Sequence, residues 1–514
     1  MTDAPLDFRN AVMADLTAGV CRFMRPAIVY GSVALTAVAL YLFATGARGG
    51  AAFALIAFGS MLGLWVWSRR GTGVPLLPML FAQNLLLYAL PILVNAPMMA
   101  SYSPAIELQS GLDVLVFSLA LIVGWSAGMN SISPVGGFCF ALSEFRHEGA
   151  RKLRLISWGL IVAATLYNLA NRGSFQDTIY NTLPPGSMSI LTALLSAAAS
   201  CGFFIGALLI GGRELRGPGK AAYWALLALN CYVAASAFLL SAACIYVLSV
   251  AIGLFWSGGR IPLRFLILVG LVFGFLNVGK DTMRDRYWRT TGTNLIPDFS
   301  LSEMPGVYSQ WFDASVSALS GERRGPRQVD GEVGIAAAAE DDHSLLARLN
   351  NLQNLLFVLR AERSQGLAPL HGATYAIIPG LLVPRVLDPK KAGTHEGQVM
   401  LNVHFQRQDL AATQTTFVAW GLLPEAVGNF GADFGGAFLG VALGFVFAAI
   451  EQWTARKLVI SFEGFVGFTL FLGIANSYEM VASVLITSLE QALISVAIAM
   501  LPVARRVRVP PRRP

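Results

Sequence analysis

The chain has 514 residues, of which 55% are hydrophobic and only 13% charged. Soluble domains carry about 25% charged residues, so the composition excludes a soluble enzyme and indicates an integral membrane protein. The net charge of +7 is compatible with binding to nucleic acid, with anionic lipid or with membrane topology. Residues 280–414 hold 14 basic and 15 acidic residues, so the basic excess lies entirely outside that stretch. The charge therefore indicates membrane orientation, and we expect no nucleic-acid partner.

The N-terminal segment and the cysteines indicate neither a cleaved signal peptide nor a reactive or metal-binding site. Residues 1–26 lack a long apolar core and do not resemble a cleaved signal peptide. The five cysteines show no CxxC or other metal-ligand spacing. We interpret them as small apolar residues and predict neither disulfides nor a metal site.

Nine apolar runs precede residue 280, each near the roughly 20 residues that a transmembrane helix needs. They centre on about 27–46, 50–67, 74–94, 111–129, 155–170, 188–210, 221–257 counted twice, and 263–279. The doubled run has no charge between Lys220 and Arg260. As one helix it would be roughly 55 Å long, against a hydrocarbon core of ~30 Å. It therefore predicts a helical hairpin.

The basic residues predict the orientation. With the N-terminus in the cytoplasm, the even-numbered connections carry the basic clusters, as at Arg69 and Arg70, and the odd-numbered connections carry few. This asymmetry follows the positive-inside rule. Residue 280 onward is then extracytoplasmic.

Four more apolar runs follow, at about 415–432, 433–452, 458–475 and 480–503. If all four crossed the membrane, the arginine-rich tail at 504–514 would lie outside, against the same rule. Residues 415–431 contain Pro424 and Glu425, so we predict a re-entrant segment there that does not span.

The expected fold is an all-α polytopic membrane protein with about twelve transmembrane helices and both termini in the cytoplasm. Residues 1–279 hold nine of these helices, and 280–432 form a long periplasmic loop with amphipathic helices and the re-entrant segment. Residues 433–503 hold the last three helices, and 504–514 form a cytoplasmic tail.

Within the loop, residues 321–343 are charged and contain glycine, which predicts a mobile linker. The leucines from Leu345 to Leu359 then recur at steps of four and three, which predicts an amphipathic helix that ends near Gly366. Arg348, Asn351 and Asn354 are spaced by three on its other side.

Several polar residues of the loop are candidates for chemistry. Lys280 and Arg284 follow the ninth run; they either snorkel and pair locally or bind a phosphate headgroup. Arg385 stands in an apolar segment, where its charge needs a partner and its guanidinium suits phosphate oxygens. Glu425 is ionisable within an apolar segment and His371 lies in the loop, so each is a candidate general base. For any one histidine, an ordinary polar loop residue is the competing interpretation.

A resemblance to a known family rests on three segments of the loop. These segments are RLNNLQNLLFVL, PLHGATYAIIPGLLVPRVLDPKK and TTFVAWGLLPEAVGNFGADFGG. The first segment has an arginine that begins a helix, Arg348. The second has G-x-x-Y and then P-R before D-x-K, at Gly372, Tyr375, Pro384, Arg385, Asp388 and Lys390. The third has E-x-x-x-N-F-G, at Glu425, Asn429, Phe430 and Gly431. In these features the chain resembles the Wzy-type O-antigen and exopolysaccharide repeat-unit polymerases of bacteria, over about residues 345–440.

The resemblance implies a glycosyltransferase of the bacterial inner membrane. Such an enzyme transfers a growing glycan from undecaprenyl diphosphate onto a sugar hydroxyl of the next lipid-linked repeat unit, on the periplasmic face. It implies no cofactor, because the donor is already activated. The implied partners are the lipid-linked donor and acceptor and membrane lipids, with a chain-length regulator and a flippase as candidates.

The implied reaction gives the candidate residues roles. Arg385, Arg348, Lys280 and Arg284 are the cations available to the leaving diphosphate. Glu425 or His371 would accept the proton of the acceptor hydroxyl. The motif adds Tyr375, Lys390 and Asn429 as substrate-binding candidates.

Two other functions stay open. An O-antigen ligase would use the same donor with a lipid A core acceptor. A flippase or other transporter would also have about twelve spans, but it should show paired halves and ionisable residues near the midplane.

Overall fold

The structure is a computed structural model, and it describes residues 13–134, 138–141, 148–172, 187–258, 261–287, 299–320, 350–383, 388, 390–413, 418–501 and 504–508. Within them, ten helices are long and apolar enough to cross a membrane. They are α1 (Met13–Ala44), α2 (Gly50–Arg70), the continuous run α3 (Leu76–Asn84), η2 (Leu85–Ala89) and α4 (Leu90–Leu93), α5 (Pro104–Ser131), α6 (Glu148–Ala170), α8 (Ser187–Gly211), α10 (Leu240–Gly258), α11 (Leu263–Tyr287), α20 (Gly435–Thr454) and α22 (Ala482–Met500).

These helices confirm that the chain is a helical, multi-pass membrane protein. Two further helices, α9 (Gly217–Ala235) and α21 (Phe462–Ser477), occupy the remaining two segments where the sequence predicts spans. The long run at 221–257 is divided between α9 and α10, as predicted for a hairpin. The number of spans and the side on which each terminus lies stay predictions.

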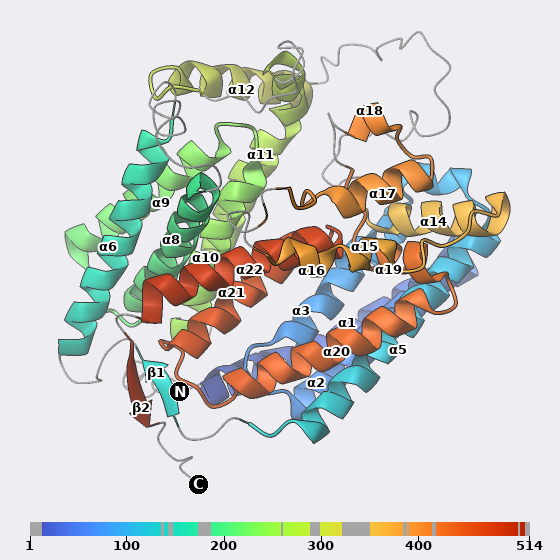
Figure 1. Ribbon diagram of the computed structural model, residues 1–514, viewed down its shortest axis with the longest axis horizontal. Helices are drawn as coiled ribbons and strands as arrows, with labels where there is room; N and C mark the ends of the chain where they lie inside the picture. Colours follow the sequence, from blue (N-terminus) through green and yellow to red (C-terminus); the bar gives the residue numbers. More distant parts are fainter. Residues whose placement is uncertain are drawn as a thin grey trace.

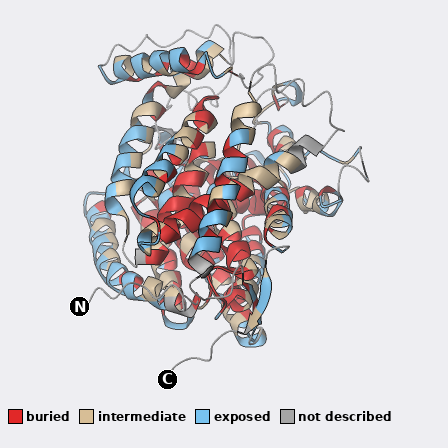
Figure 2. Cartoon of the chain, turned by 90° about the vertical axis from the view of Figure 1, so that its left-hand side faces the viewer, coloured by how far each residue is buried: buried red, intermediate tan, exposed pale blue. Residues whose placement is uncertain are grey.

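The short elements lie at the two ends of the bundle (Figure 1). One end carries α12 (Met304–Leu319), α14 (Leu352–Gln365), α17 (Glu396–His404) and α18 (Leu410–Thr413), and we call it the long-loop end. Three more short helices, α15 (Ala373–Ala376), α16 (Ile378–Leu381) and α19 (Leu422–Phe430), lie between this end and the spans. Buried residues fill the middle of the bundle, and exposed residues face outward (Figure 2).

The opposite end corrects the expectation of a purely helical chain. Residues Phe138–Ala141 form β1, which pairs antiparallel with β2 (Arg505–Arg508) in the arginine-rich tail. Lys457 Nζ donates to the carbonyl of Phe138 at 2.6 Å. A sequence search for apolar periodicity does not detect such four-residue strands, because their pairing joins residues more than 360 positions apart.

The helix predicted from the leucine pattern is α14. It ends at Gln365, and Gly366 follows in the left-handed conformation with φ 68°, so the predicted end is confirmed. The predicted start, Arg348 and the linker at 321–343 lie outside the described residues. Within the segment predicted to be re-entrant, α19 has nine residues and is about 13 Å long, too short to span.

Among the described helices, α5 and α20 form the most extensive contact. A Cβ atom built on Gly440 would lie 2.6 Å from the carbonyl oxygen of Phe117, and one on Gly444 would overlap the carbonyl oxygen of Leu121. From the other side, a Cβ on Gly124 would overlap the carbonyl oxygen of Val441. Only glycine permits this approach of the two backbones, as small residues do in membrane helix pairs.

A fully buried carboxylate holds the far end of this pair. Glu451 of α20 accepts hydrogen bonds from the indole nitrogens of Trp67 (3.0 Å) and Trp125 (2.8 Å). It also accepts from the backbone N–H groups of Leu76 and Leu77, each at 3.1 Å. Four donors from α2, α3 and α5 therefore converge on one side chain of α20, which satisfies a group that would otherwise be costly to bury.

We expect Gly444→Ala to lower the melting temperature of the purified protein in detergent. Overpacking of this kind costs about 1–3 kcal/mol. The matched control is Gly274→Ala on α11, where an added Cβ meets nothing within 4 Å; alanine there should keep or raise the melting temperature. Equal melting temperatures for the two variants would contradict the close packing of α5 and α20.

Candidate functional site

The centre of the candidate site is Glu425 on α19, which is 0% exposed. Its Oε1 accepts a hydrogen bond from Thr374 Oγ1 of α15 at 2.7 Å. Its Oε2 accepts from the backbone N–H of Ala482, the first residue of α22, at 2.6 Å. Both carboxyl oxygens are therefore engaged, and one side chain joins three helices.

Asn429 completes a closed group of polar contacts that we call the Glu425 cluster. It lies one turn after Glu425, and its Nδ2 donates to Thr374 Oγ1 and to the carbonyl of Glu425, both at 2.8 Å. The backbone N–H of Thr374 donates to Asn429 Oδ1 at 3.3 Å. Thr374 and Asn429 are 0% exposed, like Glu425.

Local sequence explains how α19 takes this position. Gly421 precedes the helix with φ 87° and Gly431 follows it with φ 82°, both values that glycine adopts readily. A Cβ on Gly421 would also overlap the side chain of Asn351. The N-terminus of α22 supplies the third partner, because its first N–H groups have no intrahelical acceptor and its dipole favours a negative charge.

Burial raises the pKa of Glu425 from 4.5 to about 7, although the bonds from Ala482 and Thr374 act in the opposite direction. A carboxyl group with this pKa gains or loses a proton near neutral pH, as catalytic acids and bases do. Glu479, half-buried between α21 and α22, likewise has its pKa raised by burial to about 7. Nothing in the local sequence pattern singled out Glu479.

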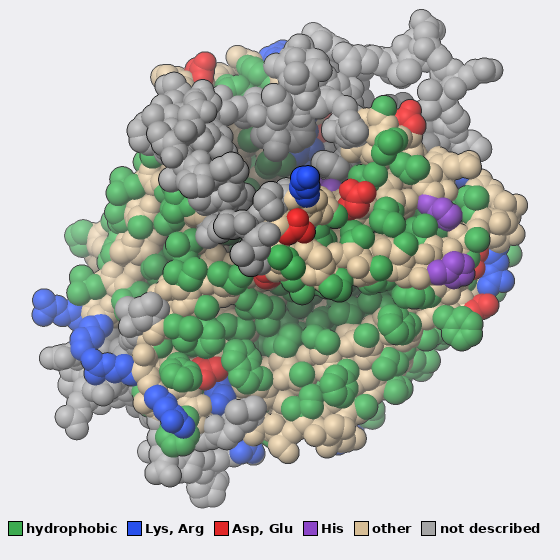
Figure 3. All heavy atoms as spheres, viewed as in Figure 1, with side chains coloured by type: hydrophobic (Ala, Val, Ile, Leu, Met, Phe, Trp, Pro, Cys, Tyr) green, Lys and Arg blue, Asp and Glu red, His purple; other side chains and the backbone are tan. Residues whose placement is uncertain are grey.

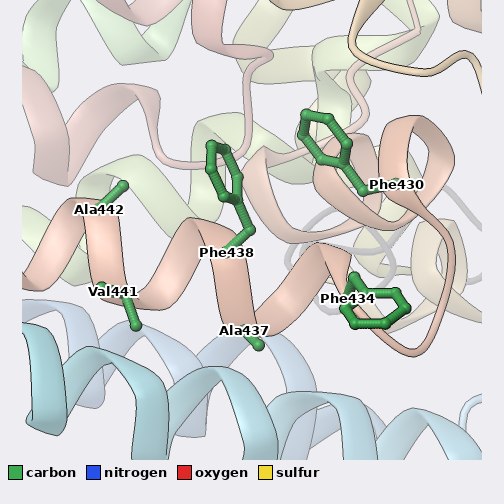
Figure 4. Close-up of a pocket in the computed structure, with 6 residues that line it drawn as sticks. All are labelled: Phe430, Phe434, Ala437, Phe438, Val441 and Ala442. Carbon is green, nitrogen blue, oxygen red and sulfur yellow. The ribbon is translucent and has the colours of Figure 1, made fainter.

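An apolar groove begins beside the cluster. It is lined by Phe430, Phe434, Ala437, Phe438, Val441 and Ala442, and the rings of Phe430 and Phe438 project on the same side of α20 (Figure 4). Hydrophobic side chains gather over this face of the molecule, which is hollowed (Figure 3). The ring of Phe430, the residue after Asn429, stacks on that of Tyr375 at 5.6 Å. Phe430 follows Asn429 and Tyr375 follows Thr374 in the sequence, so the groove lies directly beside the cluster.

His371 lies at the surface near the cluster. It is exposed and has φ 51°, and Gly372 after it has φ 84°, so the chain turns sharply into α15. Three residues further on is Thr374, which is sealed inside the Glu425 cluster. Of the two predicted bases, His371 is accessible and Glu425 is enclosed.

The predicted cations are distributed more widely. Arg284 lies on the last turn of α11 and donates from Nη2 to the carbonyl of Phe238, in the connection between α9 and α10, at 3.0 Å. Lys280 lies one turn earlier on α11. Lys390 is exposed beside Asp388, whose Oδ1 accepts from its backbone N–H. Lys280 and Arg284 thus belong to α11, and the Glu425 cluster is built from α15, α19 and α22.

Two predicted residues, Arg348 and Arg385, lie outside the described residues. The chain just before Arg385 is fixed by a residue that sequence reasoning left without a role. Lys391 Nζ donates to the carbonyls of Leu381 at 2.5 Å and Val383 at 2.6 Å, which satisfies groups at the end of α16.

The structure therefore joins three sequence-predicted residues, Glu425, Asn429 and Tyr375, at one place. It adds Thr374 and the N–H of Ala482, which sequence reasoning missed. The G-x-T-Y order beside a predicted motif could have indicated Thr374, but no local signal identifies Ala482. Within the described parts of the chain, no three His, Cys, Asp or Glu side chains come together in a way that could hold a metal ion.

The raised pKa of Glu425 predicts a pH-dependent stability. Because burial disfavours the ionised carboxylate, the cost is full above pH 7 and disappears as the pH falls to about 4.5. A shift of this size corresponds to about 3 kcal/mol. We expect Glu425→Gln to remove this contribution, so that the melting temperature of the variant minus that of the wild type rises between pH 5 and pH 8.

Thermal unfolding in detergent at several pH values measures this difference. The control is Glu303→Gln at an exposed carboxyl whose pKa is lowered by hydrogen bonds from Ser300, which should show no such rise. A constant difference between Glu425→Gln and wild type across the range would show that Glu425 does not titrate there.

Comparison of the chain with protein-family models, with curated proteins and with solved structures finds no match in any of the three.

Proposed function

We propose that this protein is a membrane glycosyltransferase that polymerises lipid-linked oligosaccharide repeat units, with undecaprenyl diphosphate as the carrier. The observation that carries the proposal is the position of the apolar groove beside the Glu425 cluster, where Phe430 of the groove stacks on Tyr375. A substrate with a long hydrocarbon chain and a polar head needs these two surfaces side by side. Two of the Wzy-like motifs, G-x-x-Y and E-x-x-x-N-F-G, lie at α15 and α19.

In the proposed reaction, the hydroxyl oxygen of the acceptor sugar attacks the anomeric carbon of the donor glycan. The bond from that carbon to the diphosphate oxygen breaks, and the lipid diphosphate leaves with its negative charge. The hydroxyl proton passes to a base on the protein. No nucleotide is needed, because the donor carries its own leaving group.

The leaving diphosphate needs cations that are fixed in place. Arg385 is our first candidate, because its guanidinium can bind two phosphate oxygens at once. It follows two residues after Val383, whose carbonyl is bound by Lys391. Arg348, Lys280, Arg284 and Lys390 are the further candidates from the sequence.

The two candidate bases, His371 and Glu425, differ in their exposure to solvent. His371 is exposed and can touch a substrate hydroxyl, whereas both oxygens of Glu425 are engaged in the buried cluster. We therefore assign proton acceptance to His371 and a positioning role to Glu425, which holds Thr374 and, through it, the turn that carries His371. Asn429 supports the same turn, and Tyr375 borders the groove.

The proposal extends to location and partners. We place the protein in the bacterial inner membrane with the long-loop end in the periplasm, where lipid-linked repeat units are joined. Its partners would be the lipid-linked donor and acceptor, together with a chain-length regulator and a flippase.

A deletion strain distinguishes the candidate functions. We expect single repeat units to accumulate on the lipid carrier, as seen on a gel of lipid-linked and surface glycans. Long polymer trapped on the carrier would instead indicate an O-antigen ligase. Repeat units confined to the cytoplasmic leaflet would indicate a flippase.

Variants in the same strain test the residues. We expect Arg385→Ala and Arg385→Lys both to abolish long glycan, because lysine lacks the bidentate contact. His371→Ala should reduce polymerisation by about 10²–10⁴-fold, the usual contribution of a general base. The matched control is His395→Ala, since His395 precedes α17 and its Nδ1 is hydrogen-bonded to Gln398.

Each variant must first be shown to insert at the wild-type level. Normal chain length in Arg385→Lys would show that a bidentate phosphate contact is not required. Full polymerisation in His371→Ala would remove His371 as the base, and loss in Glu425→Gln alone would return that role to Glu425.

A further inference from the structure

The helix α12 at the long-loop end has one buried side. Met304, Val307, Trp311 and Ser315 are buried and recur at helical spacing. This side covers the connection between α9 and α10, where the ring of Trp311 lies 5.2 Å from that of Phe238. The ring of Tyr308 stacks on Tyr232 of α9 at 4.3 Å. The packing partner of this side is therefore the protein itself.

A second apolar side of α12 faces outward. Phe312, Val316 and Leu319 are spaced by four and three, so they form one stripe along the helix. Their exposed fractions are 56%, 44% and 63%. We call these three residues the outer stripe. A stripe of large apolar side chains left in water would be unfavourable, and it indicates an interaction surface.

The contacts of α12 with α11 show at which level along α11 the helix α12 lies. Trp311 Nε1 donates to the carbonyl of Leu276 at 2.7 Å. A Cβ built on Gly279 would lie 2.6 Å from the backbone nitrogen of Ser315, so the two helices touch there. These contacts lie before the charged last turns of α11, which begin at Lys280. Figure 1 shows α12 lying across the end of α11.

The outer stripe continues a surface that already faces lipid. The ring of Phe312 lies 5.1 Å from that of Phe275 on α11. The neighbouring outward side chains of α11, Leu268, Leu271 and Val272, are exposed by 61%, 68% and 47%. Because α11 is one of the helices long and apolar enough to span, its exposed apolar side is the side that contacts hydrocarbon.

The opposite edge of α12 is polar. Gln310 Oε1 accepts hydrogen bonds from Arg286 (2.9 Å) and from Tyr287 (2.8 Å) in the last turn of α11. Asp313, next to Phe312, is exposed. Tyr287 and Trp311 lie at this end of α11, and tyrosine and tryptophan rings are enriched at the boundary between membrane and water.

We propose that α12 is an interfacial helix whose outer stripe inserts into the bilayer leaflet at the long-loop end. The outer stripe then contacts the acyl chains of that leaflet, and the polar edge of α12 lies in the headgroup layer. Since α12 lies directly before residue 321, the bilayer then holds the first part of the long loop at the membrane surface. The inference does not depend on the proposed enzymatic activity.

Photo-crosslinking of the full chain in vesicles tests the proposal. The vesicles contain phosphatidylethanolamine and phosphatidylglycerol, and p-benzoylphenylalanine replaces either Phe312 or Val316. Asp313 is the matched control, because consecutive helical residues point about 100° apart. Leu268 is the positive control on the spanning helix. Mass spectrometry of the irradiated protein measures the lipid adducts.

We expect lipid adducts at Phe312 and Val316 at yields close to that at Leu268, and at least about fivefold lower at Asp313, which points to the polar side. Adducts at Leu268 without any at Phe312 and Val316 would overturn the proposal, and so would equal yields at Phe312 and Asp313. A covalent dimer formed at Phe312 would show that a second copy covers the stripe. None of these outcomes depends on glycan synthesis, so a failure here is distinct from a failure of the proposed enzyme.

Discussion

The close approach of α5 and α20 is the contact on which the rest of the structure depends. Gly440 and Gly444 let the two backbones touch within α20, and other contacts hold α20 at both of its ends. At one end, Glu451 gathers donors from α2, α3 and α5. At the other end, a Cβ on Gly435 would overlap the carbonyl of Ala426, so the start of α20 lies directly against α19. The position of α19 is therefore set by a helix pair outside the Glu425 cluster.

The position of α19 brings the carboxyl group of Glu425 into contact with two other helices. A carboxyl group with no exposure is costly to bury unless donors surround it. Here the donors are a side chain of α15 and the first N–H of α22, so the same bonds that satisfy Glu425 also hold two other elements. The accessible group beside it is His371, at the end of a turn that the cluster supports.

Two of the apolar surfaces that the described residues expose are the groove along α20 and, on a different part of the molecule, the outer stripe of α12. In water both would favour association. In a bilayer both are compatible with hydrocarbon, whether from the membrane or from a lipid-linked substrate. In our proposal, α12 lies at the boundary between water and bilayer, with Phe312, Val316 and Leu319 toward hydrocarbon and the side of Gln310 toward water.

The sequence by itself determined the class of fold and several local features. Lipid offers no hydrogen bonds to the backbone, so spans must be long apolar helices, and hydropathy identifies them. The end of α14 near Gly366 was also predicted from local pattern, and Glu425 and Asn429 were candidates from the sequence motif. Only the tertiary structure decided the partners: Thr374 and Ala482 for Glu425, four donors for Glu451, and β1 for the arginine-rich tail. These contacts join residues 51 to 384 positions apart, and such pairings depend on how whole helices pack rather than on any local preference.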